Sequence, residues 1–205
     1  IKGVSKNNQL LGTYVLSPSG YAFSSGDETA GLVANSSTYY TITFLDPDRQ
    51  INYFQLAKSG TDVRFITVLY PTNTTTWGSK PTITSLGEDS QKAGVKVLFS
   101  DGGTDYVFST YGTVGDVTVG NFAYNGKAAT IRRDGSGNLK SLFLTRGTYL
   151  KEGATNLVQN LNTNAVFDAV YSGSSIAVTG ENINSFTLYA PGVSSLTVNG
   201  TNQNF

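Results

Sequence analysis

Short runs of alternating or β-branched apolar residues recur along the whole chain, and each run ends at turn residues. In a strand, successive side chains point to opposite faces, so these runs predict half-buried β-strands. Short strands at a spacing of roughly 8–12 residues are typical of a β-sandwich or a β-barrel. The predicted strands are residues 12–16, 31–33, 39–45, 51–57, 64–70, 82–86, 94–100, 105–109, 115–119, 122–124, 127–133, 139–145, 148–151, 156–159, 165–171, 174–180, 185–189 and 194–198.

The segments between these runs are rich in glycine, asparagine and aspartate, which favour turns. Asn125-Gly126 lies between two short apolar runs and predicts a tight type I′ hairpin. Residues 17–27 contain proline and glycine and are expected to form a long loop or a ligand-contacting segment. Residues 89–94 are the best candidate for a helix, of about one turn. Further turn signals are Asp101-Gly102-Gly103, Asp134-Gly135-Ser136-Gly137, Ser172-Gly173 and Pro191-Gly192.

The whole pattern predicts an all-β fold with little or no helix. We expect two large antiparallel sheets that pack as one β-sandwich domain over residues 1–205. The alternative is a pair of smaller sandwiches that divide near residues 110–120. No proline- and serine-rich linker long enough to separate two domains is visible.

Composition limits the classes of function that are open to the chain, because it contains no histidine, no cysteine and no methionine. Histidine is the commonest general acid or base and the commonest metal ligand, and cysteine is a ready nucleophile. Most routes to catalysis and to transition-metal binding are therefore closed, and we expect a binding or structural module rather than an enzyme. Catalysis by carboxylates, a serine–lysine pair or tyrosine stays open.

The balanced net charge of the chain does not favour two classes of binding partner. Lys+Arg and Asp+Glu both number 14, so the sequence gives no electrostatic case for nucleic acid or a membrane surface. No apolar run approaches the roughly 20 residues of a membrane-spanning helix. Low charge with abundant Asn, Thr, Ser and aromatic residues resembles secreted bacterial proteins that act on polysaccharides. The chain begins at Ile1, so we expect a piece of a longer secreted protein.

Four stretches stand out by their order: 65–71 (FITVLYP), 95–108 (VKVLFSDGGTDYVF), 142–150 (LFLTRGTYL) and 186–200 (FTLYAPGVSSLTVNG). Taken alone, the first predicts a buried strand that Pro71 stops, since proline cannot donate to a sheet. Together, over roughly residues 39–200, they resemble the C-terminal β-sandwich of heparinase II/III-type polysaccharide lyases and their chondroitin, hyaluronan and alginate lyase relatives.

The resemblance implies an accessory role. In those lyases a separate helical domain supplies the Asn, Tyr, His and Arg residues of the reaction, and this chain has neither such a domain nor a histidine. It therefore implies a secreted, non-catalytic carbohydrate-binding module beside a neighbouring catalytic domain of the parent chain. The implied ligand is an acidic polysaccharide such as xanthan, alginate or a glycosaminoglycan. The alternative is a structural sandwich that has no ligand and packs on a neighbouring domain. Uncapped sheet edges leave room for a dimer.

Trp77, the only tryptophan, lies in a polar loop between Tyr70 and Lys80. An indole face suits the apolar face of a sugar ring, so Trp77, Tyr70 and Lys80 form a candidate aromatic and cationic site. The competing interpretations are that Trp77 anchors the loop on the sandwich and that Tyr70 belongs to the core at a strand end.

Arg132-Arg133 ends a predicted strand just before Asp134. The pair could grip a carboxylate or sulfate of an acidic sugar. Alternation, however, directs neighbouring residues of a strand to opposite faces, so at most one of them shares a face with any ligand. The favoured interpretation is that the two arginines point to opposite faces and that one of them pairs with Asp134.

Asp46 and Asp48 are two residues apart in a turn and form a candidate structural calcium site, because calcium prefers such oxygens. Asp101 and Asp105 around Gly102-Gly103 raise the same question. An ordinary Asp-rich turn is the more frequent explanation, and no other cofactor is expected.

Overall fold

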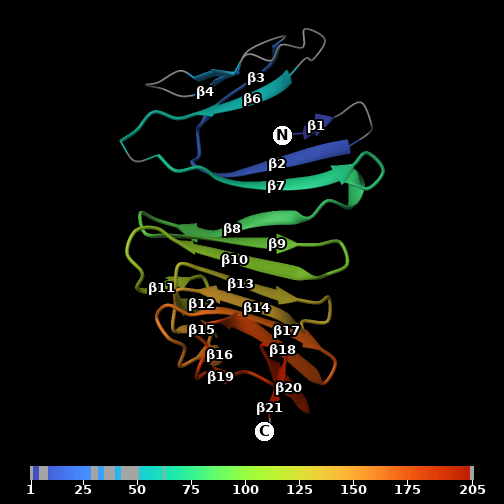
Figure 1. Cartoon of the computed structure of the whole chain (residues 1–205). Coiled ribbons are helices and arrows are strands. Elements are labelled where there is room, and N and C mark those ends of the chain that lie inside the picture. Colours follow the sequence, from blue (N-terminus) through green and yellow to red (C-terminus); the bar gives the residue numbers. More distant parts are fainter. Residues whose placement is uncertain are drawn as a thin grey trace. The chain divides into compact units, whose positions relative to one another are not determined.

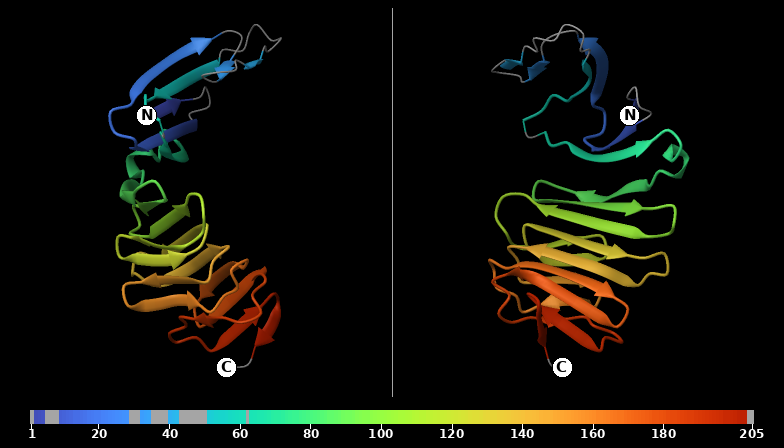
Figure 2. Two further views of the ribbon diagram at one scale, coloured as in Figure 1. Left: turned by 90° about the vertical axis from the view of Figure 1, so that its left-hand side faces the viewer. Right: turned by 45° about the vertical axis from the view of Figure 1, so that its right-hand side comes forward.

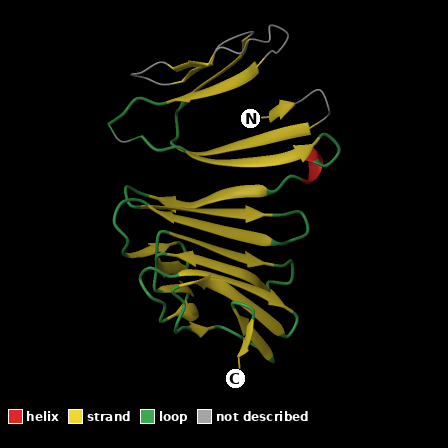
Figure 3. Cartoon of the chain, in the orientation of Figure 1, coloured by secondary structure: helices red, strands yellow, loops and turns green. Residues whose placement is uncertain are grey.

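The computed structural model is built almost entirely of β-strands (Figure 1). The structure describes residues 2–4, 9–28, 32–34, 40–42, 51–61 and 63–203. Within these residues the helical content is a single 3₁₀ turn, η1 (Trp77–Ser79), which is red in Figure 3. None of the described residues forms a helix long and apolar enough to cross a membrane.

The chain divides into two compact units. The first contains Ile1–Tyr14 and Leu69–Phe205, and the second contains Val15–Val68. Residues 110–120, where the alternative division was expected, lie within the first unit. The expectation of a single domain stays a prediction.

In the second unit, β3 (Ala22–Glu28) pairs antiparallel with β6 (Ile51–Ala57), and β4 (Leu32–Ala34) pairs with β5 (Tyr40–Ile42). The prediction of a loop over residues 17–27 is therefore wrong for β3. Its Ser- and Gly-rich sequence has little strand character of its own, and pairing with β6 supplies the regular structure. Asp46 and Asp48, the candidate calcium ligands, lie outside the described residues.

The first unit contains a nine-stranded sheet, in the order β21-β20-β18-β17-β14-β13-β10-β9-β8, and a five-stranded sheet, in the order β11-β12-β15-β16-β19. A three-stranded sheet has the order β1-β2-β7. The nine strands are β8 (Thr82–Glu88), β9 (Lys92–Leu98), β10 (Thr104–Thr110), β13 (Ala128–Arg133), β14 (Leu139–Thr145), β17 (Val166–Ser172), β18 (Ser175–Glu181), β20 (Ser195–Val198) and β21 (Thr201–Gln203). The others are β11 (Asp116–Val119), β12 (Phe122–Asn125), β15 (Tyr149–Glu152), β16 (Thr155–Gln159), β19 (Thr187–Leu188), β1 (Lys2–Val4), β2 (Gln9–Ser17) and β7 (Ile66–Asn73).

The nine-stranded and five-stranded sheets pack face to face as a β-sandwich (Figure 2). Alternate residues of both sheets meet in one core, in which Tyr124 and Leu150 of the five-stranded sheet and Ile131, Leu142 and Leu144 of the other are fully buried. This confirms the all-β sandwich predicted from the hydrophobic pattern. One detail differs, because β18 and β20 pair in parallel while the other pairs of the nine-stranded sheet are antiparallel.

The Asn125-Gly126 hairpin prediction is wrong. β12 before it pairs with β11 and β15, whereas β13 after it pairs with β10 and β14. The dipeptide therefore carries the chain from one sheet to the other. The Asp134–Gly137 turn, in contrast, joins the paired strands β13 and β14 as a true hairpin.

Two further predictions fail for physical reasons. Residues 89–94 form no helix; Asp89 accepts hydrogen bonds from the main-chain N–H groups of Gln91 and Lys92, at 2.7 and 3.0 Å, and so caps the β8–β9 turn. Pro71 does not stop its strand, since β7 runs on to Asn73. The residues of β7 are half-buried or exposed in alternation, and Leu69 is 57% exposed, so this is not a buried strand.

Candidate functional site

Several turns gather at one end of the nine-stranded sheet. Thr104 is paired with both Leu98 and Arg133, and Leu98 is also paired with Thr82, so the start of β8 and the β9–β10 and β13–β14 turns lie at the same end. The remaining pairings place the β17–β18 turn and the start of β20 there too. We call this region, formed by residues 73–81, 99–103, 134–138, 172–175 and 189–194, the turn end.

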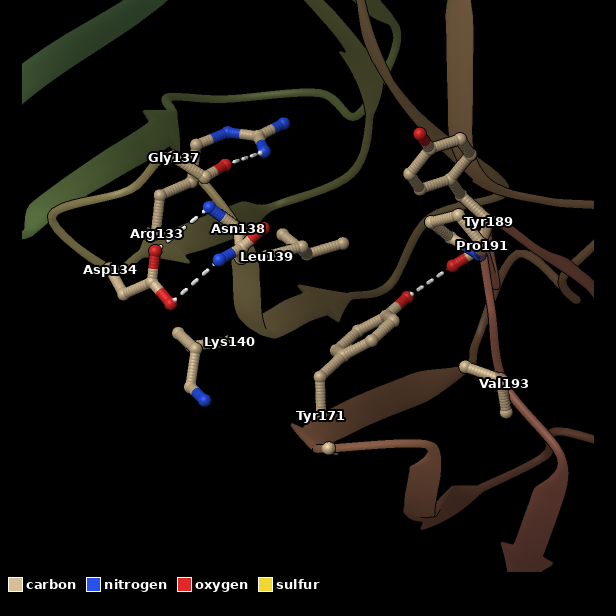
Figure 4. Close-up of a pocket in the computed structure, with 11 residues that line it drawn as sticks. Arg133, Asp134, Gly137, Asn138, Leu139, Lys140, Tyr171, Tyr189, Pro191 and Val193 are labelled. Carbon is tan, nitrogen blue, oxygen red and sulfur yellow. Dashed lines mark hydrogen bonds between the residues drawn. The ribbon is translucent and has the colours of Figure 1, made fainter.

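The turn end contains an open hollow of about 320 Å3, shown in Figure 4 and here named the Tyr189 hollow. Tyr189, Pro191 and Val193 from the segment between β19 and β20 form one side of its lining. Arg133 and Lys140, which flank the β13–β14 hairpin turn, form another side of the hollow. The Tyr189 side chain is 40% exposed, so an aromatic face is available beside polar groups.

A buried tyrosine fixes the position of that aromatic segment. The hydroxyl of Tyr171 on β17 donates a hydrogen bond of 2.7 Å to the main-chain carbonyl oxygen of Tyr189 (Figure 4). Burial raises the pKa of the Tyr171 phenol well above its usual value, and the nearby Tyr189 acts in the same direction. Tyr171 is therefore a neutral donor, and the bond holds the main chain of residue 189 and not its ring.

Arg133 joins the two sheets at the edge of the same hollow. It donates to the carbonyl oxygen of Gly137 at 2.8 Å, and it forms a salt bridge with Glu152 of β15 in the five-stranded sheet. Both side chains are about four-fifths covered, with 21% and 24% exposed. Its charge is thus already balanced by a carboxylate of the chain itself.

The turn between β13 and β14 is rigidly hydrogen-bonded. Asp134 accepts from the main-chain N–H groups of Ser136 and Asn138, at 3.0 and 2.9 Å, and from the side-chain amide of Asn138 at 3.2 Å. The bonds from Asn138 come first among the causes that lower the pKa of Asp134, and the charge of Lys140 adds to them. Within the described residues Lys140 forms no salt bridge, so it is the lining cation whose ammonium is least committed.

A second open hollow, of about 370 Å3, lies beside the first and is named the Phe99 hollow. Arg132 lines it and forms two parallel bonds of 2.7 Å with the carboxylate of Asp105 on β10. The guanidinium carbon of Arg132 also lies 5.9 Å from the centre of the Phe99 ring. The Arg132 side chain is 57% exposed, so part of the guanidinium faces solvent.

The structure gives the two arginines different partners, which the sequence did not identify, yet both line the Phe99 hollow, and the pairing of β13 with β14 shifts register between them. Arg132 is exposed and paired with Asp105, whereas Arg133 is largely covered and paired with Glu152. The expected pairing of one of them with Asp134 is wrong, because Asp134 is engaged by its own turn. The carboxylate partners are distant in sequence, so only the strand register could have revealed them.

Trp77 and Lys80 come together at the beginning of β8. The Lys80 Nζ lies 5.3 Å from the centre of the Trp77 ring. The indole edge packs on β2 so closely that a Cβ added to Gly12 would lie 2.7 Å from the Trp77 Cζ3 atom. Tyr14, two residues further along β2, donates a hydrogen bond of 3.2 Å to the carbonyl oxygen of Pro81. These contacts are those of a loop anchor, which was one of the two interpretations of Trp77.

Tyr70 and the arginines complete the set of predicted residues. Tyr70 is half-buried on β7. The pKa of Tyr14 is raised mainly by burial and further by its electrostatic interaction with Tyr70. β9 and β10 lie between β8 and β13 in the sheet, so β13, which carries Arg132, is roughly 14 Å from β8 at the usual strand spacing. The two predicted clusters therefore share the turn end but occupy different parts of it.

The Asp101 and Asp105 carboxylates have separate partners. Asp101 accepts from the main-chain N–H of Gly103 at 2.8 Å, whereas Asp105 holds Arg132. Among the described residues no three acidic side chains are grouped as a metal site. A structural calcium ion stays a prediction.

Sequence reasoning missed Tyr189, Tyr171 and Lys140. The Pro191-Gly192 signal marked the turn that presents Tyr189, but nothing in the sequence relates that turn to the β13–β14 hairpin. No protein-family model and no curated protein matches the chain.

Proposed function

We propose that the chain is a non-catalytic carbohydrate-binding module and that its saccharide occupies the Tyr189 hollow. The observation that carries the proposal is an exposed aromatic ring beside fixed polar groups in one open hollow. A sugar ring has an apolar C–H face and a rim of hydroxyl groups, and sites for such ligands combine apolar walls with a few placed polar groups. The absence of histidine and cysteine from the sequence supports binding without catalysis.

The polar groups of the hollow are held in place before any ligand arrives. The salt bridge of Arg133 with Glu152 and the hydrogen bonds of Asp134 fix the hairpin side, and the Tyr171 hydroxyl fixes the segment that carries Tyr189. Side chains that are already ordered lose little entropy on binding. This preorganisation supports a ligand site rather than an ordinary surface depression.

An acidic polysaccharide is the proposed ligand class, and Lys140 is the residue that supports it. The two arginines expected to grip an anion are engaged by Asp105 and Glu152. Lys140 lines both hollows and is free to approach a carboxylate or sulfate group. We propose that the module acts in a secreted protein, where it holds a neighbouring catalytic domain close to the polymer and so raises its effective concentration.

The test is affinity electrophoresis through gels that contain xanthan, alginate, hyaluronan, heparin, xylan or hydroxyethyl cellulose. We expect retardation by at least one polymer and its loss in Tyr189→Ala. That variant keeps the main-chain carbonyl that accepts from Tyr171. The matched control is Tyr149→Ala, since Tyr149 lies at the opposite end of β15 from Glu152. Unretarded migration of the unchanged chain in every gel would overturn the proposal.

The alternative of a structural sandwich without a ligand has one observation in its favour. Val107 and Val170 alternate with core residues of β10 and β17, so they lie on the outer face of the nine-stranded sheet, where they are 42% and 49% exposed. Phe143 is half-buried on the same face. Apolar groups on an open sheet face favour packing on a neighbouring domain of the parent chain. Binding of a hydrophobic dye that Val107→Thr and Val170→Thr abolish, with no retardation in any gel, would support this alternative.

A further inference from the structure

The Tyr189 hollow and the Phe99 hollow are neighbours with a common wall. Arg133, Asp134 and Lys140 line both of them, so the hollows adjoin across the β13–β14 turn. Asp134 and its three hydrogen bonds hold this turn in shape. A ligand that fills one hollow therefore contacts residues that also line the other.

The chemistry of the Phe99 hollow suits hydroxyl groups. Arg132 has five N–H donors, and its two bonds to Asp105 leave further donors on an exposed guanidinium. The Asp105 carboxylate, in turn, keeps unused lone pairs beside them. A sugar hydroxyl both donates and accepts hydrogen bonds, so two adjacent hydroxyls can bond to such a charge-balanced pair without bringing a charge of their own. The Phe99 ring supplies an apolar wall next to this pair.

From this arrangement we infer that the two hollows are adjoining subsites for consecutive sugar residues of one polysaccharide chain. The inference rests on the proposed function and deepens it. One sugar residue packs on Tyr189, and the next bonds to the Arg132–Asp105 pair. Lys140, which faces both subsites, lies where an acidic group near the linkage would be placed. The module accordingly recognises at least two consecutive sugar residues and not a single sugar.

The experiment measures affinity against chain length by calorimetry. The probes are the mono-, di- and tetrasaccharides released from whichever polymer retards the unchanged protein. Two filled subsites predict that the disaccharide binds about tenfold or more tightly than the monosaccharide, which corresponds to about 1.4 kcal/mol. Equal affinity for the monosaccharide and the longer probes would overturn the inference and leave the proposed function standing. If no polymer retards the protein, the proposed function itself fails.

Substitutions in the Arg132–Asp105 pair test whether the Phe99 hollow is the second subsite. Arg132→Gln removes the guanidinium group at an exposed position, so the sandwich should still fold. Asp105→Asn is an independent variant of the same pair. We expect each to weaken tetrasaccharide binding about tenfold and to leave monosaccharide binding within about twofold. Arg146→Gln, at an exposed arginine beyond the other end of β14, is the control and should change neither affinity. A loss shared equally by the monosaccharide and the tetrasaccharide, or no loss at all, would contradict a second subsite.

Discussion

The hydroxyl of Tyr171 is bonded to the main-chain carbonyl oxygen of Tyr189 at 2.7 Å, and this bond joins β17 to the segment that leads into β20. Tyr171 is 8% exposed and belongs to the sandwich core, whereas Tyr189 is 40% exposed in the hollow. A core residue thus positions a surface aromatic through the backbone. The bond therefore links the sandwich core to the residue that carries the proposed binding role.

Replacing Tyr171 by Phe removes the donor and leaves the ring. The carbonyl oxygen of Tyr189 then lacks its partner, so we expect the free energy of unfolding to fall by about 0.5–1.5 kcal/mol. Urea-induced unfolding measures this change. Tyr189→Phe removes a hydroxyl from the same pair of residues without touching the bond, and it should change stability by less than about 0.5 kcal/mol. Equal effects of the two variants would contradict the assigned role of the bond.

Alkaline pH should destabilise the fold through Tyr171. Burial raises the pKa of Tyr171 above its usual value near 10, so the folded chain holds this proton more tightly than the unfolded chain does. The contribution to stability is complete below about pH 10 and is lost as the pH rises further. Tyr124, also buried, adds to the effect in the same direction. Unfolding titrations at several alkaline pH values should show a shallower decline in Tyr171→Phe, and an unchanged slope would refute the assignment.

The two arginine pairs should differ in their contribution to stability. Arg133 and Glu152 join the two sheets and are 21% and 24% exposed, whereas Arg132 is 57% exposed. Glu152→Gln leaves a largely covered guanidinium without its counter-charge, and we expect a loss of about 1.5–3 kcal/mol in urea unfolding. Asp105→Asn should cost less than about 1 kcal/mol, because the Arg132 guanidinium that loses its counter-charge is exposed to solvent. The reverse order would show that Arg133 does not need its partner across the sheets.

Lys140 should strengthen binding to an acidic polysaccharide. Lys140 lines both hollows and carries a positive charge, so Lys140→Gln should weaken retardation by an acidic polysaccharide and leave any retardation by a neutral one unchanged. Added salt should reduce the difference between the two proteins, since it screens exposed charges. Lys92→Gln is a suitable control, because Lys92 pairs with Asp89 at the far end of β9. If Lys140→Gln weakened retardation equally in gels of neutral and of acidic polysaccharide, Lys140 would not recognise the negative charge of the polymer.

The sequence predicts most strands because alternation is a local property. The predicted ranges for β6 and β14 coincide with the strands Ile51–Ala57 and Leu139–Thr145. β3 was missed because its strand character comes from pairing with β6, which no local pattern records. Asn125-Gly126 was misread for a related reason. A turn signal tells where the chain bends, but not whether the strands on either side belong to the same sheet.

The candidate site was harder to predict than the fold. Arg132 and Arg133 were identified from their residue type, but their partners Asp105 and Glu152 are 27 and 19 residues away. The Tyr189 hollow needs three turns to meet at one end of a sheet, which depends on the whole strand order. Residue type therefore gave candidates, and register decided which of them meet.

A substitution at Gly147 tests the position at which the chain crosses from the five-stranded to the nine-stranded sheet. A Cβ at this buried position would overlap the carbonyl oxygen of Asn125 and lie 2.6 Å from the Cα of Gly126. Backbone atoms cannot move aside as a flexible side chain can, so Gly147→Ala should destabilise the chain by about 1–3 kcal/mol or more in urea unfolding. Gly115→Ala is the matched control, because no atom lies within 4 Å of its Cβ position and its φ is not in the left-handed region. That substitution should be neutral or stabilise by about 0.4–1 kcal/mol, since alanine restricts the unfolded chain. If Gly147→Ala were as stable as Gly115→Ala, the chain would not cross between the sheets against residue 147 as described.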